Sequence, residues 1–367
     1  MAKEVRQTAY GIERLRGYPR PSRPKGKTQL SAKTGHAVGK GMTSETLINV
    51  AGGIAVGAAV LTALYVATNW TPERTINQLR VRWGRPPSTF INVAGMTVHL
   101  RDEGPRDDPS PIMLLHPTVS SLHTWDGWTE ALKDQRRVIR FDLRGFGLTG
   151  PSPDGRYGFD DDVRMVIAVL DHLGIERCVM GGNSLGGGVS WRTAVEHPSR
   201  VEKLILVDAE GYATTPISQP LAFYFSGLPM HNWMVRNTFP RGLIEQGLRN
   251  VFGNPCKVTN EMIIRTRELT ECKGNRHALI QRGRQWKEQA KHAPQAHRIV
   301  EVTQPTLIIW GGLDRLIPPS AAHRFHRDIA DSTLVMFDDL GHMPQEEDPV
   351  RTVAAVKKFL GLEQASA

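Results

Sequence analysis

Apolar residues gather in one long run and in several short ones along this chain. The long run, TLINVAGGIAVGAAVLTALYVAT at residues 46–68, lies in a stretch with no charged residue between Glu45 and Glu73. At about 1.5 Å per residue, roughly 20 apolar residues cross a hydrocarbon core roughly 30 Å thick. The run predicts one transmembrane helix, with Tyr65 and Trp70 at the level of an interfacial aromatic belt. A buried soluble helix is the alternative, and a cleavable signal peptide fits badly because no A-x-A site follows.

From residue 90 onward, short apolar runs alternate with segments of helical spacing. The first run, at residues 90–104, predicts two antiparallel strands around Ala94-Gly95. Further strands are predicted where short apolar runs end in turn residues, at 111–117, 136–147, 177–184, 203–210, 305–312 and 332–339. Apolar residues at helical spacing predict helices at 163–175 and 185–198. The alternation predicts an α/β fold with a mostly parallel, doubly wound sheet.

The chain divides into regions of different character. Residues 1–44 are rich in Pro, Gly, Lys and Arg and have no apolar periodicity, which is typical of disorder. Residues 212–300 lack strand-like runs and indicate an inserted helical cap. The predicted organisation is a basic disordered tail at 1–45, a transmembrane helix at 46–68, a linker at 69–87, a first core segment at 88–211, the cap at 212–300 and a second core segment at 301–362.

Charge is distributed unevenly along the chain. The formal net charge is +9, and residues 1–45 hold ten Lys and Arg against three Glu. The positive-inside rule therefore predicts a single-pass membrane protein with a cytoplasmic N-terminus and the main domain on the opposite side. Residues 236–298, within the predicted cap, hold thirteen Lys and Arg against five Glu. This excess indicates a solvated helical face, or attraction to an anionic membrane or an acidic substrate.

The stretch GGNSLGGG at residues 181–188 places Ser184 between a predicted strand and a predicted helix. Glycine is poor in both elements, so several glycines at one strand end indicate a backbone constraint that outweighs propensity. In the pattern Gly182-x-Ser184-x-Gly186, a sharp strand-to-helix turn puts the serine in strained backbone angles, and side chains at the flanking glycines would clash. The turn would expose the hydroxyl at a helix N-terminus, which favours developing negative charge.

A serine hydroxyl is a poor nucleophile at neutral pH and needs a base, which in turn needs an orienting acid. Asp314 follows the predicted strand at 305–312, and His342 lies in the loop after the last predicted strand. Ligands of parallel sheets bind outside the carboxyl ends of the strands, so these positions are expected to converge. The order Ser184, Asp314, His342 is the one that accompanies this kind of turn.

The chain resembles the α/β-hydrolase superfamily over about residues 88–362. The resemblance rests on Ser184, Asp314 and His342 and on the stretches LLHPT, FDLRGFGLT, IIWGGLDRLIP and GHMPQEEDP. The resemblance implies an α/β-hydrolase fold, a hydrolase of ester or amide type, and a helical cap that shapes the substrate pocket. It also implies that Ser184 is the nucleophile, Asp314 the orienting acid and His342 the general base.

The resemblance further implies an oxyanion hole built from backbone N–H groups. One donor is expected from Leu185, directly after the nucleophile, and the other from the loop after residues 111–117. The family usually has His-Gly there, whereas this chain has His116-Pro117, and proline has no N–H. We therefore assign the second donor to Thr118.

The sequence thus predicts a membrane-anchored serine hydrolase that cleaves a small-molecule or lipid-like ester through an acyl-enzyme on Ser184. No metal, cofactor or nucleic-acid partner is expected, and the membrane is the expected partner. Two alternatives on the same triad are a carbon–carbon bond hydrolase and a cofactor-free peroxidase. A third is a non-catalytic hydrolase-like membrane scaffold, for which Pro117 is the support. Haloalkane dehalogenases and epoxide hydrolases of this fold use an aspartate at the turn, so Ser184 speaks against both.

Overall fold

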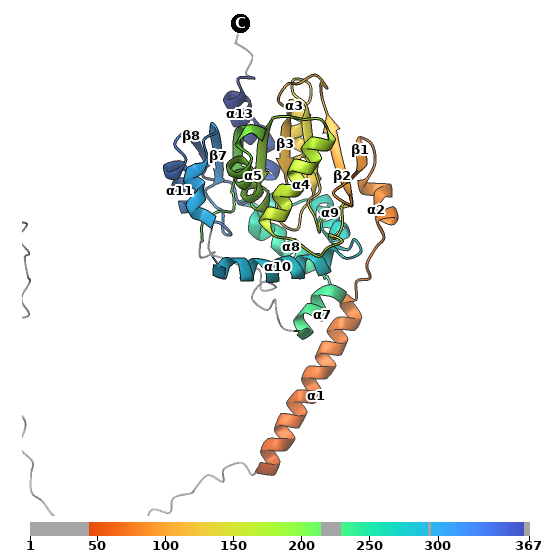
Figure 1. Cartoon of the computed structure of the whole chain (residues 1–367). Coiled ribbons are helices and arrows are strands. Elements are labelled where there is room, and N and C mark those ends of the chain that lie inside the picture. Colours follow the sequence, from red (N-terminus) through yellow and green to blue (C-terminus); the bar gives the residue numbers. More distant parts are fainter. Residues whose placement is uncertain (1–43, 214–228, 293–294, 363–367) are drawn as a thin grey trace, which may run out of the picture. The chain divides into compact units, whose positions relative to one another are not determined.

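An eight-stranded sheet forms the centre of the computed structural model, which describes residues 44–213, 229–292 and 295–362 (Figure 1). The strand order is β1-β2-β4-β3-β5-β6-β7-β8. Strand β2 pairs antiparallel with β1 and with β4, and the other neighbours are parallel. The strands are β1 (Ser88–Val93), β2 (Met96–Glu103), β3 (Ile112–Leu115), β4 (Val138–Phe141), β5 (Cys178–Asn183), β6 (Val201–Val207), β7 (Thr306–Gly311) and β8 (Ser332–Phe337). The predicted mostly parallel α/β sheet is confirmed.

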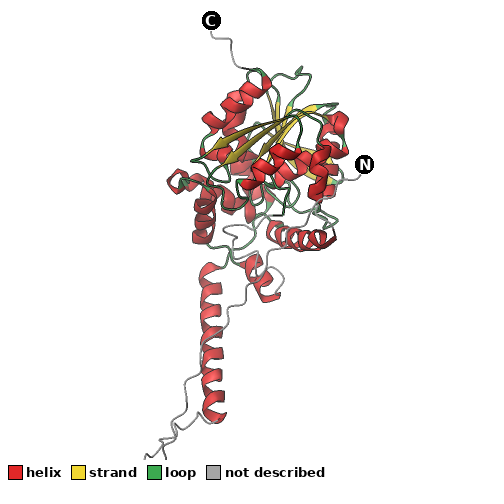
Figure 2. Ribbon diagram, turned by 90° about the vertical axis from the view of Figure 1, so that its left-hand side faces the viewer, coloured by secondary structure: helices red, strands yellow, loops and turns green. Residues whose placement is uncertain are grey.

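Helices cover both faces of the sheet (Figures 1 and 2). Successive side chains of a strand point to opposite faces, so Ile112 and Leu114 of β3 join one core cluster and Met113 and Leu115 the other. The first cluster includes α3 (Asp126–Leu132) and α13 (Pro349–Leu360), and the second includes α4 (Phe159–His172), α5 (Leu185–Glu196) and α11 (Ser320–Asp328). Short helical segments join these elements, at η1 (Leu122–Trp125), η2 (Pro198–Arg200), η4 (Gln295–Glu301) and α12 (Pro344–Glu347).

Four helices of the cap lie between β6 and β7 in the described part of the chain. They are α7 (Pro229–Asn237), α8 (Arg241–Val251), α9 (Asn260–Thr270) and α10 (Asn275–His292), with η3 (Pro255–Lys257) between α8 and α9. In Figure 1, α8, α9 and α10 lie across one end of the sheet. Part of the basic excess of the cap is used to bind it to acids outside the cap, in the pairs Lys257–Asp348, Arg265–Glu346, Arg282–Asp162 and Arg298–Glu196. The excess is thus not only a solvated face.

The long apolar run forms α1 (Ser44–Asn69), a 26-residue helix. It is the one helix in the described residues that is long and apolar enough to span a membrane, and its central side chains are not buried by the protein. The division of the chain into two units falls within α1, after Gly57, so the C-terminal part of α1 belongs to the unit that contains the sheet. The basic tail predicted at 1–45 lies outside the described residues, except for Ser44 and Glu45.

Residues 70–83, which we call the strap, fasten the end of α1 to the cap. Trp70 forms a β-bridge with Thr238. The Thr71 N–H donates to the carbonyl of Asn237 at 2.8 Å, and the carbonyl of Thr71 accepts from Arg276 Nη2 at 2.7 Å. These contacts lie within the stretch 69–87, where the sequence predicts a linker.

The strap ends in α2 (Ile76–Trp83), which packs against the folded domain. The helix begins with a capping box, in which the Thr75 hydroxyl accepts from the Gln78 N–H. Leu79 and Trp83, one turn apart, are buried in a cluster with Leu148, Leu269 and Cys272. The packing of α2 therefore ties the strap to both the sheet domain and α9.

We expect Leu79→Ala to lower the free energy of unfolding of the detergent-solubilised full chain by about 2–4 kcal/mol, because it leaves a cavity in that cluster. Leu79 is 1% exposed, whereas Val81 on the same helix is 69% exposed. Val81→Ala is therefore the matched control and is expected to change the free energy by less than about 0.5 kcal/mol. Urea denaturation measures both, and equal stability of the two variants would show that the strap is not part of the folded domain.

Candidate active site

Ser184 lies at the junction between β5 and α5 in a strained backbone conformation. Its φ is 53° and its ψ is −116°, a region that a residue with a Cβ rarely occupies. Three backbone hydrogen bonds hold it there: its N–H donates to the carbonyl of Val207 at 3.0 Å, and its carbonyl accepts from Gly188 at 2.9 Å and from Glu210 at 3.0 Å. Ser184 is partly exposed, while its neighbours on both sides are buried. The turn therefore presents the serine at the surface of the sheet end.

The glycines that flank Ser184 are required by close backbone contacts. A Cβ on Gly182 would lie 2.2 Å from the carbonyl carbon of Gly186. A Cβ on Gly186 would lie 2.1 Å from the carbonyl oxygen of Leu115, at the end of β3. Such distances are far below van der Waals contact, so the turn exists only because both positions lack a side chain. The steric reason expected from the sequence is present in the structure.

Asp314 and His342 form a buried hydrogen-bonded pair. Asp314 follows β7 and His342 follows β8, and His342 Nδ1 lies 2.7 Å from Asp314 Oδ2. The other oxygen of Asp314 accepts from the N–H groups of Leu316 at 2.7 Å and Ile317 at 3.0 Å. A carboxylate has no proton to donate, so Nδ1 carries the proton and Nε2 of His342 is left as an acceptor. The structure thus brings together the two residues that the sequence assigns as orienting acid and base.

Asn183 connects the Ser184 turn to the loop of His342. Its Nδ2 donates to the carbonyl of His342 and to that of Val207, each at 3.0 Å. Its Oδ1 accepts from Nε2 of Gln345 at 3.1 Å. The His342 N–H in turn donates to the carbonyl of Val251, at the end of α8 in the cap. Sequence reasoning passed over Asn183 and Gln345, although a buried amide directly before the serine is a usable signal.

The loop after β3 carries Thr118 and approaches the start of α5. Its His116 is buried: Nε2 accepts from the Leu143 N–H at 2.9 Å, and Nδ1 donates to the carbonyl of Pro117 at 2.7 Å. Burial lowers the pKa of His116, which suits this neutral bracing role. Thr118 follows on the partly exposed side of the loop, and Leu185 is the first residue of α5, where an N–H has no intrahelical acceptor. Both expected oxyanion donors therefore come from segments that meet at Gly186.

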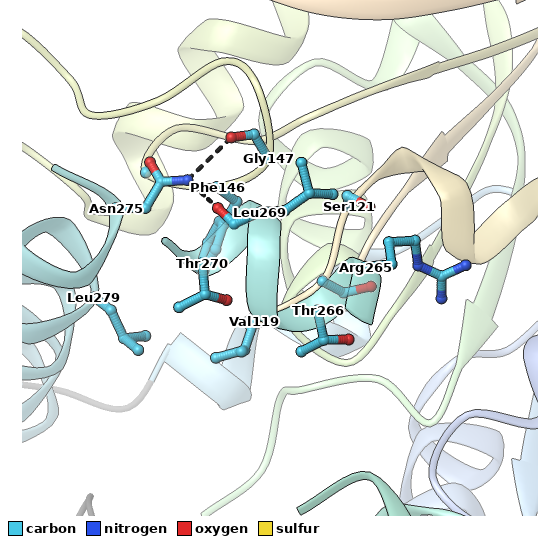
Figure 3. Close-up of a pocket in the computed structure, with 12 residues that line it drawn as sticks. Val119, Ser121, Phe146, Gly147, Arg265, Thr266, Leu269, Thr270, Asn275 and Leu279 are labelled. Atoms are coloured by element: carbon cyan, nitrogen blue, oxygen red, sulfur yellow. Dashed lines mark hydrogen bonds between the residues drawn. The ribbon is translucent and has the colours of Figure 1, made fainter. Parts of the chain in front are cut away.

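A small hollow of about 10 Å³, room for about one water molecule, lies between the loop after β3 and the cap. Figure 3 shows its lining, which comes from residues 119–121, residues 145–147 and the helices α9 and α10. Its apolar lining residues are Val119, Phe146, Leu269 and Leu279. Asn275 fastens the cap to this region, because its Nδ2 donates to the carbonyls of Gly147 and Leu269. Ser184, Asp314 and His342 are not among the lining residues, so this hollow does not itself contain the candidate catalytic residues.

One group in the described residues combines residue types that can bind a metal. Ligand-type atoms of Asp208, Asp314 and His342 lie within 4.8 Å of one another, and all three residues are buried. Two of the three are already hydrogen-bonded to each other. The group is therefore two acids and a base close together, and Asp208 is the member to which the sequence assigned no role.

We expect Gly186→Ala to lower the melting temperature of the protein, because its Cβ meets the backbone of β3 rather than a movable side chain. Overpacking of this kind costs about 1–3 kcal/mol. Gly283→Ala is the control, because Gly283 lies inside α10 and a Cβ there would meet nothing within 4 Å. Alanine there is neutral or stabilises the helix by up to about 1 kcal/mol. A Gly186→Ala variant as stable as the control would contradict the steric account of the turn.

Comparisons with known proteins agree with this fold. A family model described as the alpha/beta hydrolase fold matches residues 110–244 and 266–349. The 2-hydroxymuconate semialdehyde hydrolase of Pseudomonas sp. (strain CF600) is 29% identical over 285 residues, which are 76% of this chain and 95% of that protein. The enzyme of the same name from Pseudomonas putida is 30% identical over 284 residues, 74% of this chain and 92% of that protein.

Solved structures give the same result. The meta-cleavage product hydrolase from Pseudomonas fluorescens IP01 matches with a TM-score of 0.64 and 26% identity, over 75% of this chain and 97% of that one. The family assignment therefore rests on these matches, on the sheet order and on the turn at Ser184, and not on the resemblance of short motifs alone. The chain belongs to the α/β-hydrolase family and is a hydrolase of that fold.

Proposed function

We propose that this hydrolase is a membrane-anchored serine hydrolase that cleaves a neutral ester with an apolar acyl group through an acyl-enzyme on Ser184. The observation that carries the proposal is the 2.7 Å hydrogen bond between His342 and Asp314, in a loop that Asn183 ties to the Ser184 turn. A strained, partly exposed serine and an imidazole oriented by a carboxylate are the parts that nucleophilic catalysis requires, and Asn183 joins the segments that carry them.

The first half-reaction forms the acyl-enzyme. Nε2 of His342 takes the proton of the Ser184 hydroxyl while its oxygen attacks the ester carbonyl carbon. Asp314 stabilises the imidazolium that results. The carbonyl oxygen becomes an oxyanion, which accepts hydrogen bonds from the N–H groups of Leu185 and Thr118. When the tetrahedral intermediate collapses, His342 returns the proton to the alcohol oxygen and the alcohol leaves.

The second half-reaction releases the acid. Water loses a proton to Nε2 of His342 and attacks the acyl carbon, and the same two N–H groups receive the oxyanion. Collapse breaks the bond to Ser184, and His342 returns the proton to the serine oxygen. Pro117 does not interrupt this path, because Thr118 supplies the N–H and His116 holds the carbonyl of Pro117.

The lining of the hollow supports a neutral, apolar substrate. Arg265 is the one cation among its described lining residues, and its guanidinium is already paired with the carboxylate of Glu346. Residues 212–230 of the cap, of which 214–228 lie outside the described residues, contain no Lys, Arg or His. A carboxylate on the substrate therefore has no uncommitted cation among these residues, whereas an acyl chain has apolar side chains to contact.

A second candidate function is hydrolysis of a carbon–carbon bond. The relatives named for 2-hydroxymuconate semialdehyde favour it, at 29–30% identity over most of both chains. That name denotes a carboxylate, which the paired Arg265 disfavours as a substrate group. Ser184, Asp314 and His342 serve either reaction, so the leaving group, an alcohol oxygen or a carbon atom, distinguishes the two functions.

Membrane attachment through α1 is supported by its length and by the strap. A helix of 26 residues is about 39 Å long, enough to cross a bilayer core. Because Trp70 follows the last residue of α1 and is already bridged to Thr238, a membrane-spanning α1 would hold the cap at the membrane surface. Trp70 and Trp233 are each about half exposed, with ring centroids 6.2 Å apart, and suit an interfacial belt. The basic N-terminal tail favours a cytoplasmic N-terminus and a catalytic domain on the opposite side.

We expect Ser184→Ala to reduce kcat for ester hydrolysis by about 10⁴–10⁶-fold, because no other group in the site replaces the nucleophile. The melting temperature is expected to stay the same or rise, because the hydroxyl is not needed to hold the turn. Steady-state kinetics and thermal unfolding of the full chain measure both quantities. Activity retained by a folded variant would exclude Ser184 as the nucleophile.

Substrate class is tested with the full chain in phosphatidylcholine vesicles, using p-nitrophenyl esters from acetate to laurate alongside 2-hydroxymuconate semialdehyde. We expect kcat/KM to rise along the ester series by about threefold to fourfold for each methylene that the protein buries, because a buried methylene contributes about 0.8 kcal/mol. Turnover of the semialdehyde with no turnover of the esters would instead establish the carbon–carbon hydrolase.

A further inference from the structure

Asp208 is a buried carboxyl group beside the catalytic pair with no role in the mechanism above. It follows β6 directly, as Asp314 follows the neighbouring strand β7, and it has no exposed surface. Its φ is 42°, a left-handed conformation that is uncommon for a residue with a side chain. Its Oδ1 accepts the N–H of Gly311 at 3.0 Å, whereas its Oδ2 is buried without a hydrogen-bond partner.

A buried, unpartnered carboxylate oxygen is costly, and a second charge nearby increases that cost. Ligand atoms of Asp208, Asp314 and His342 lie within 4.8 Å of one another. Two carboxylates so close and shielded from water do not both ionise readily. Burial first, and then the charge of Asp314, raise the pKa of Asp208 well above its usual range, and the carboxylate of Glu347 acts in the same direction.

The hydrogen bonds decide which carboxyl group keeps the proton. Asp314 accepts from two backbone N–H groups and from His342, so three donors already point at its oxygens. Asp208 accepts from one backbone N–H only. A proton on Oδ2 of Asp208 removes the buried charge and gives this oxygen a hydrogen to donate, with Asp314 as the nearby carboxylate acceptor.

We propose that Asp208 is a positioning residue that carries a proton on Oδ2 and presents it to the carboxylate of Asp314, and that it serves as a reserve orienting acid when Asp314 is neutral. The reserve role follows from the same geometry. If residue 314 carries no charge, the repulsion from it disappears while the burial of Asp208 stays, so Asp208 ionises at a lower pH than it does beside an ionised Asp314, within 4.8 Å of His342. The inference rests on the proposed serine-hydrolase function for its kinetic readout, but not for the proton on Asp208.

The proton is tested directly by infrared spectroscopy of the full chain in detergent. At neutral pH, the spectrum of the unsubstituted protein minus that of Asp208→Asn is expected to contain the C=O stretch of a buried neutral carboxylic acid. Asp338→Asn is the control, because Asp338 directly follows β8 but is exposed, and its difference spectrum lacks that band. Absence of the band in the Asp208 difference would overturn the proposal, whatever the protein catalyses.

The positioning role is tested by the pH profile of kcat/KM for a short soluble ester. Asp208→Val removes the O–H donor and so leaves more negative charge on Asp314, which faces His342. This variant is expected to raise the apparent pKa of the acid limb of the profile and to lower kcat about tenfold. Asp208→Asn, whose amide still donates, is expected to restore the profile and most of kcat. Thermal unfolding confirms that both variants fold. Identical profiles for Asp208→Val and the unsubstituted protein would overturn the positioning role.

The reserve role is tested by comparing Asp314→Asn with the double variant Asp314→Asn/Asp208→Asn. The single variant is expected to keep at least about tenfold more kcat than the double variant, and only its activity is expected to rise with pH as Asp208 ionises. Equal kcat in the two variants would overturn the reserve role. The two proposals can also fail separately. If the protein hydrolyses none of the esters but still shows the infrared band, the proposed function is contradicted and the assignment of the proton to Asp208 is unaffected.

Discussion

Ser184 is held at φ 53° and ψ −116° because two glycines allow β5 and α5 to meet without side chains between them. The same close contact brings α5 against the carbonyl of Leu115, so the end of β3 and its loop lie beside the start of the helix. Backbone hydrogen bonds between Ser184 and both Val207 and Glu210 hold the end of β6 at the same turn. Three strand ends therefore converge on one residue, and the nucleophile, the oxyanion donors and Asp208 all take their places from this convergence.

The cap is fastened to the catalytic loop on one side and to the apolar helix on the other. The carboxylate of Glu347 accepts N–H groups from Gly253 and Asn254 after α8, and also from Gly341, next to His342. At its other end the cap is bonded to the strap that follows α1. A continuous set of contacts thus runs from the end of the apolar helix to the proposed base. On the proposed function, a substrate drawn from the membrane meets the cap first.

Much of the fold could be predicted, and the candidate catalytic residues could be chosen, because the signals are local. Each strand is a short apolar run, and Ser184, Asp314 and His342 each stand directly after one, where ligands of parallel sheets gather. The strap was harder to predict, because its packing is decided by partners far along the chain. Thr75 with Gln78, and Leu79 with Trp83, were nevertheless a readable capping box and apolar pair.

Other features were set by distant pairings that a single sequence does not reveal. The role of Asp208 depends on the adjacency of β6 and β7, which brings it to Asp314. The basic excess of the cap was ambiguous because its partners, such as Asp162 and Glu346, lie on the core elements α4 and α12. In both cases the sequence shows the residue types, but it does not show which distant residue each of them contacts.

Whether Ser184 is an activated nucleophile is the central question, and covalent labelling answers it most directly. The full chain is treated with a fluorophosphonate, digested and mapped by mass spectrometry, in parallel with a His342→Ala variant. The account predicts a single adduct, on the peptide that contains Ser184, and its loss in the variant because the base is missing. A folded protein that forms no adduct, or forms it on another residue, would contradict the account, and the first outcome would favour a non-catalytic scaffold.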